Sequence, residues 1–137
     1  MRTMVDLAQL IVASWVIANA DESSTIPTSE GVIDRALKAA ADDPTFPGWA
    51  REMLHFVNSR FGLQCVESEA ILQAAGKAKL TSDPNPTYTR TEITATPRVA
   101  RYLLSRLSVS LEEAREIGLA LKRGGSPATE SVMAAAM

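Results

Sequence analysis

The chain is poor in the side chains that most catalytic and metal-binding sites require. Its 137 residues include one cysteine, Cys65, and one histidine, His55. A single cysteine excludes an intrachain disulfide and a cysteine-based zinc cluster, and it is typical of a buried residue in a reducing compartment. Glycines occur singly or as the pair Gly124-Gly125, so no stretch forms a glycine-rich phosphate-binding loop.

Both residue pairs that include His55 are weak candidates for chemistry. His55 and Cys65 form the one available Cys–His pair, and no neighbouring residue predicts an activated thiolate. Glu52 and His55 have a spacing with which a helix can offer two metal ligands, but the chain has no second histidine for such a site. We therefore expect a surface imidazole, a packed thiol and a non-enzymatic protein, with no catalytic residue, metal or cofactor.

Aromatic residues make up only 5% of the chain, whereas alanine recurs in every expected helix. This composition predicts closely packed helices joined by small-residue contacts. The most apolar run, Leu7–Ala18 (LAQLIVASWVIA), is shorter than the ~20 residues of a bilayer span. It is apolar nearly all the way round a helix, which predicts the buried centre of the domain or one side of an oligomer interface. The self-association hypothesis names Val5, Val12, Val16 and Leu119.

The N-terminus also allows a second interpretation. Arg2, the apolar run and the triplet Ala18-Asn19-Ala20 can be read as a secretory signal covering residues 1–20. Asp6 and Gln9 interrupt the basic-then-apolar order of such signals. We therefore favour a cytoplasmic protein and keep the secreted form as the alternative.

Apolar periodicity and capping residues predict a mainly α fold, a compact bundle of about six helices with a short extended or hairpin segment near residues 79–94. One helical domain, residues 1–124, would precede a mobile tail, residues 125–137. The threonine-rich segment Thr87–Thr94 could pair back onto Ala78–Thr81 or lie extended. The expected helices are Met4–Ala20, 28–41, Pro47–Phe61, Val66–Lys79, Pro97–Leu107 and Leu111–Arg123.

Charge is distributed unevenly along the chain. Residues 1–50 carry three basic and seven acidic groups, whereas residues 77–106 carry six basic and two acidic groups. The basic region predicts a surface for phosphates or for an acidic protein. The alternative is a solvated helix face whose arginines pair with the acidic N-terminal half. The candidate partner-binding residues are Lys79, Arg90, Arg98, Arg101, Tyr102 and Arg106.

These observations favour a small regulatory or adaptor protein that binds a protein partner and forms a homo-oligomer. The alternative is a helix-turn-helix transcription regulator that binds DNA through residues 77–106. Its two helices would be Pro47–Phe61 and Val66–Lys79, with the Pro84 loop as a wing, or Pro97–Leu107 and Leu111–Arg123. The second helix of each pair begins with glutamates, which would repel DNA phosphates. They make DNA binding the weaker hypothesis. They are Glu67 and Glu69 in the first pair, and Glu112, Glu113 and Glu116 in the second.

Overall fold

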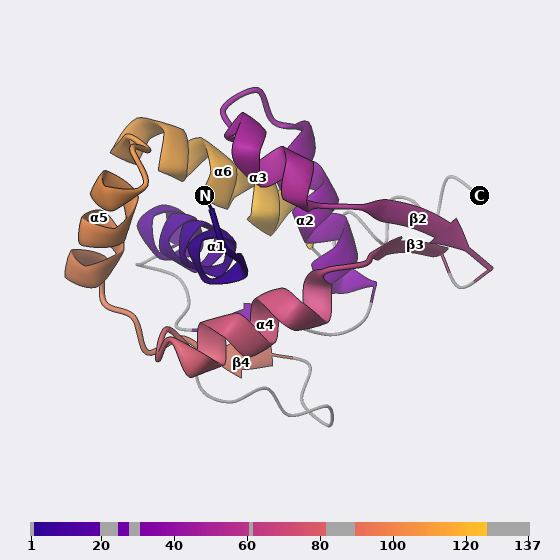
Figure 1. Cartoon of the computed structure of the whole chain (residues 1–137), viewed down its shortest axis with the longest axis horizontal. Coiled ribbons are helices and arrows are strands. Elements are labelled where there is room, and N and C mark those ends of the chain that lie inside the picture. Colours follow the sequence, from indigo (N-terminus) through magenta and orange to yellow (C-terminus); the bar gives the residue numbers. More distant parts are fainter. Residues whose placement is uncertain (1, 20–24, 28–30, 61, 82–89, 126–137) are drawn as a thin grey trace.

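A computed structural model describes residues 2–19, 25–27, 31–60, 62–81 and 90–125 of the chain. Its helices are α1 (Met4–Asn19), α2 (Val32–Asp42), α3 (Gly48–Met53), α4 (Ser68–Lys77), α5 (Pro97–Arg106) and α6 (Leu111–Gly124). Its strands are β1 (Thr25–Pro27), β2 (Phe56–Ser59), β3 (Gly62–Cys65) and β4 (Arg90–Glu92). These six helices and short strands confirm the predicted mainly α fold (Figure 1).

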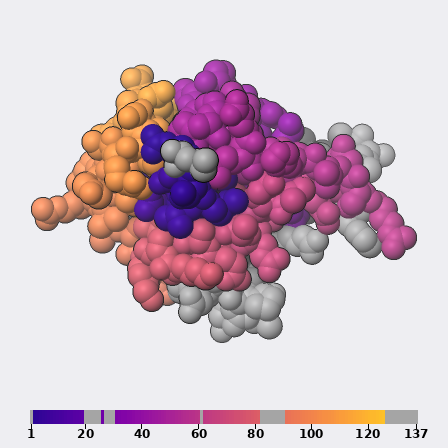
Figure 2. All heavy atoms as spheres, in the orientation of Figure 1, coloured from indigo at the N-terminus to yellow at the C-terminus, as the bar shows by residue number. Residues whose placement is uncertain are grey.

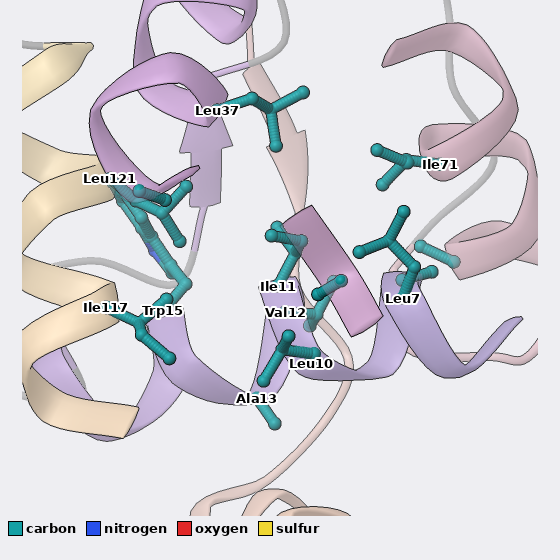
Figure 3. Packing of buried hydrophobic residues seen from close by; sticks show 14 of the residues in the cluster. Leu7, Leu10, Ile11, Val12, Ala13, Trp15, Leu37, Ile71, Ile117 and Leu121 are labelled. Atoms are coloured by element: carbon teal, nitrogen blue, oxygen red, sulfur yellow. The ribbon is translucent and has the colours of Figure 1, made fainter. Parts of the chain in front are cut away.

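Helix α1 is the centre of the molecule, as its all-round apolar sequence predicted. It packs against α4, α5 and α6, which surround it in Figure 1. Figure 3 shows Leu7 of α1 pointing toward Ile71 of α4, and Trp15 lying toward Ile117 and Leu121 of α6. Removal of residues 1–20 as a signal peptide would take away the helix around which the others pack.

The self-association hypothesis is wrong for two of its residues. Val12 and Val16 are only 3% and 6% exposed, because α1 is covered by its own chain. They offer no surface to a second copy. Val5 and Leu119 are exposed.

None of the helices in the described ranges has both the length and the apolar character needed to cross a bilayer.

Two helix contacts depend on glycine. A Cβ atom at Gly118 of α6 would collide with the carbonyl oxygen of Ser14 and the Cβ of Ala18 in α1, and would lie 2.9 Å from the carbonyl carbon of Ser14. At Gly124, a Cβ would lie 2.6 Å from the carbonyl oxygen of Arg35 in α2. The small residues therefore let α6 approach both α1 and α2 at backbone distance.

The prediction of one helix over Pro47–Phe61 is wrong. Helix α3 ends at Met53, and the chain continues as β2, which pairs with β3 in an antiparallel hairpin. Gly62 has a φ of 106°, so it supplies the left-handed residue of the hairpin turn, not the end of a helix. The helix-turn-helix pair built from Pro47–Phe61 and Val66–Lys79 is therefore excluded.

Arg51 holds α3 against the end of α2. Its Nε donates a hydrogen bond of 2.8 Å to the carbonyl oxygen of Ala41, and its Nη2 donates at 3.1 Å to those of Asp43 and Phe46. The end of α2 has carbonyl groups without helical partners, and the guanidinium satisfies them.

Asp34 has a different role from the one its sequence position suggests. Its spacing to Lys38 is that of a surface ion pair, but Lys38 pairs with Asp42 at 3.2 Å. Asp34 is buried and accepts hydrogen bonds from the backbone N–H of Gly31 at 2.8 Å and of Cys65 at 2.7 Å. It thus caps α2 and joins it to β3.

In the segment near residues 79–94, Lys79 and Leu80 form a turn, and Thr81 and residues 90–93 pair with other strands or bridge residues. Thr81 and Ile93 form an antiparallel bridge, which agrees with the predicted pairing onto Ala78–Thr81. Strand β4 also pairs antiparallel with β1, and this partner was not predicted. The loop at 82–89, with Pro84, and the predicted tail from 126 onward lie outside the described residues.

Candidate interaction surface

Helices α5 and α6 form a fixed helix-turn-helix unit on the surface of α1. The Oγ1 of Thr96 accepts a hydrogen bond of 3.2 Å from the backbone N–H of Val99 and so begins α5. Ser108 in the turn has a φ of 60°, and the next residue, Val109, is buried. The second predicted helix-turn-helix pair is therefore present as a geometric unit.

A capping box sets the start of α6. The Oγ of Ser110 accepts from the N–H of Glu113, and the carboxylate of Glu113 accepts from the N–H of Ser110, both at 3.1 Å. Both hydrogen bonds follow from the Ser-x-x-Glu sequence. Because both helices also pack on α1, their outer faces are held at fixed positions.

The outer face of α5 carries two arginines and a tyrosine. Ala100, Leu103 and Leu104 are buried, so residues on the opposite side of the helix face solvent. Arg98, Arg101 and Tyr102 are exposed, with Tyr102 at 67%. Neither guanidinium has a hydrogen bond or an ion pair within the described part of the chain. We call these three residues the α5 surface.

Arg106 does not belong to this surface. Its Nη2 donates to the Oδ1 of Asp6 in α1 at 3.1 Å and also to the Oε1 of Gln9. The hydrogen bond from the backbone N–H of Thr3 lowers the pKa of Asp6 most, and Arg106 lowers it further, against the opposing effect of burial. Arg106 therefore joins α5 to Asp6 in the acidic N-terminal half of the chain, as the alternative interpretation of the arginines expected.

Lys79 and Arg90 lie away from α5. Lys79 is exposed in the turn after α4, and its carbonyl oxygen accepts a hydrogen bond of 2.8 Å from the Oγ1 of Thr94. The backbone of Arg90 begins β4, and its side chain lies outside the described part. Both positions lie at α4 and its neighbouring strand, on another side of α1 (Figure 1).

The outer face of α6 has the opposite charge at its start. Glu112, Glu113 and Glu116 are exposed in its first two turns, beside the exposed Leu111. A DNA-binding helix-turn-helix unit places the beginning of its second helix against the bases and phosphates. Three carboxylates at that position oppose binding to a polyanion.

The hairpin brings the carboxylate of Glu67 next to both His55 and Cys65, a position that the sequence did not predict. The Nδ1 of His55 lies 2.8 Å from the Oε2 of Glu67, and the Sγ of Cys65 lies 3.8 Å from its Oε1. Desolvation raises the pKa of Cys65 to about 11, so the group is a thiol at neutral pH and a poor nucleophile. Within the described ranges, no three His, Cys, Asp or Glu side chains are placed to hold a metal ion.

Comparison with known proteins gives no relative. No family model matches the chain. Neither a curated protein nor a solved structure matches it. The arrangement of its own surface residues is therefore the basis for a function.

Proposed function

We propose that this chain is a non-enzymatic regulatory or adaptor protein that binds an acidic segment of a protein partner through the α5 surface. The observation that supports it is the pair Arg98 and Arg101 beside Tyr102 on a rigid helix, without a partner in the described part of the chain. Residues three and four apart share one face of a helix. The two cations and the ring can therefore contact one ligand together.

The chemistry of these side chains suits carboxylates on a protein. A guanidinium binds a carboxylate through two parallel hydrogen bonds, which gives direction as well as affinity. A tyrosine adds a large apolar contact area and a hydroxyl, and Tyr and Arg are enriched among the residues that dominate protein interfaces. An acidic segment with an apolar residue next to its carboxylates would match both features.

DNA binding is the second candidate, and one observation favours it. The turn between α5 and α6, with the left-handed Ser108 and the capping residue Ser110, has the form of a helix-turn-helix motif. Two observations oppose it. The start of α6 is acidic, and the whole chain has a formal net charge of −2, whereas DNA-binding domains are usually basic.

The non-enzymatic part of the proposal agrees with the state of the one cysteine. A buried thiol with a pKa of about 11 is protonated at neutral pH. A free thiol also suits a reducing compartment, which supports a place in the cytoplasm.

Charge reversal on α5 tests the proposal. Partners captured from the native host would be compared for the wild-type chain, the double variant Arg98→Glu/Arg101→Glu and the control Arg115→Glu, an exposed arginine on α6. We expect the double variant to capture at least tenfold less partner than the wild type, and the control to capture the same amount. Equal capture by the double variant would exclude the α5 surface.

A random DNA duplex separates the two candidates. Binding that weakens steeply with salt would favour DNA, because neutralised phosphates release counterions. We expect no binding to the duplex even at low ionic strength.

A further inference from the structure

Strand β2 of the β2–β3 hairpin has an open backbone edge. The N–H of Val66 donates to the carbonyl oxygen of His55 at 2.8 Å, so these two residues form a hydrogen-bonded pair of the ladder. Such pairs alternate along antiparallel strands. Val57 therefore points its backbone groups toward β3, whereas Phe56 and Asn58 point theirs away from it.

Within the part of the chain that the structure describes, the outer edge of β3 is occupied at Cys65 but not at Leu63, whereas that of β2 is open at both Phe56 and Asn58. The outward N–H of Cys65 donates to the buried carboxylate of Asp34, and β3 packs against α2. The backbone groups of Phe56 and Asn58 have no such partner among the described residues. The hairpin also projects beyond the helices (Figures 1 and 2), and the side chain of Phe56 at its base packs against the core. An open edge of this kind is a template for pairing with another strand.

The solvent-facing side of the hairpin is apolar next to this edge. Val57 lies opposite Gln64, and Val66 follows two residues later on the same face. Val57 is 47% exposed and Val66 is 61% exposed. The two valines are diagonal neighbours on this face, so the hairpin exposes two apolar side chains next to the edge.

We propose that a second copy of this chain pairs with the open edge, β2 against β2, antiparallel about a two-fold axis at Val57. In an antiparallel pair, hydrogen bonds must join residues whose backbone groups point outward on both strands. Phe56 then pairs with the partner's Asn58, and Asn58 pairs with the partner's Phe56. The result is a four-stranded sheet that crosses the axis.

Two features of this register support a second copy as the occupant. It places Val57 opposite the partner's Val57 in a non-hydrogen-bonded pair, where facing side chains are closest. A two-fold interface must be complementary to itself, and β2 meets this condition in both its backbone groups and its exposed valine. The paired strands have four residues each, so the contact is small and the dimer is expected to be weak.

The proposal moves the self-association surface from α1 to β2. It also goes beyond the proposed function, because it does not involve the α5 surface. Reversal of Arg98 and Arg101 should leave the dimer intact.

A charge swap at the axis tests this pairing on the full chain. Sedimentation velocity over a range of concentrations would follow the wild type, Val57→Lys, Val57→Glu and their equimolar mixture. We expect the wild type to dimerise and each variant alone to weaken the dimer at least tenfold, because like charges would meet across the axis. The mixture should dimerise again, since opposite charges would then face each other.

Leu119→Lys is the matched control, because Leu119 is a similarly exposed apolar residue on α6, at 37%. It should leave the dimer unchanged. A wild type that stays monomeric, a dimer that survives Val57→Lys, or a mixture that does not reassociate would each overturn the proposal. A monomer that instead loses a different bound protein on Val57→Lys would assign the edge to that protein.

Discussion

The contact between α1 and α6 should be the part of this fold least tolerant of one added methyl group. Gly118→Ala places a Cβ against the carbonyl oxygen of Ser14 and the Cβ of Ala18. Neither atom is the end of a flexible side chain, so no rotamer change can relieve the overlap. The two helices must move apart, and the buried contacts between them must loosen with them.

Two opposing effects determine how much stability Gly118→Ala should lose. Overpacking of a well-packed core costs about 1–3 kcal/mol, and more where backbone atoms collide. Alanine in place of glycine in a helix returns up to about 1 kcal/mol. Because a collision with backbone atoms belongs at the upper end of the overpacking range, we expect a net loss of about 2 kcal/mol in the free energy of unfolding. For a chain of this size it would lower the Tm by roughly 6–10 °C.

Gly48→Ala is the matched control. Gly48 begins α3, and a Cβ built there meets no atom within 4 Å. This variant should be neutral or slightly more stable. Urea unfolding followed by circular dichroism would compare both variants with the wild type. If Gly118→Ala were as stable as Gly48→Ala, the close approach of α6 to α1 would be refuted.

Two further predictions concern titratable groups. The pKa of folded Asp6 lies below its unfolded value of ~3.9, so its contribution to stability is present above that value and is lost as the pH falls through the folded pKa. Urea unfolding between pH 6 and pH 3 should therefore show a smaller decline in stability for Asp6→Asn than for the wild type, and equal declines would contradict the lowered pKa of Asp6. Cys65, with a pKa of about 11, should react with iodoacetamide at pH 7.5 far more slowly in the folded chain than in urea. Similar rates in both states, measured by mass spectrometry, would show that the thiol is not buried.

Local signals predicted the helices that carry the candidate surface. Thr96-Pro97 and the Ser110-x-x-Glu113 box begin α5 and α6 in the structure as they do in the sequence pattern. Spacing along α5 also placed Arg98, Arg101 and Tyr102 on its exposed face. Such features depend on residues within one or two turns, so the sequence alone contains the information.

The hairpin could not be found in the same way. A helical spacing is present in Phe46, Met53, Val57 and Phe61. This pattern predicts a helix more strongly than the few β-branched and aromatic residues predict a short strand. Contacts distant in sequence decide the outcome, since Asp34 binds the backbone of Cys65 across 31 residues. Two alternating residues in each strand are too few to reveal a hairpin.

The sequence also could not show which arginines belong to the candidate surface, because this depends on contacts between residues distant in sequence. Arg106 lies in the same helix as Arg101, but it is joined to Asp6 across 100 residues. No periodicity distinguishes an arginine that serves the fold from one that faces solvent. The proximity of His55 to Glu67 was missed for the same reason, because it depends on the hairpin between them.

The position of α1 has a consequence for how the chain is made. Helices α5 and α6, which cover two of its sides, are translated about a hundred residues after α1. Contacts between such distant segments form slowly, and an uncovered apolar helix is prone to aggregate in the meantime. A nascent chain halted before residue 97 would therefore present α1 as a ready target for chaperones, and newly made protein would depend on them more than the small size of the domain suggests.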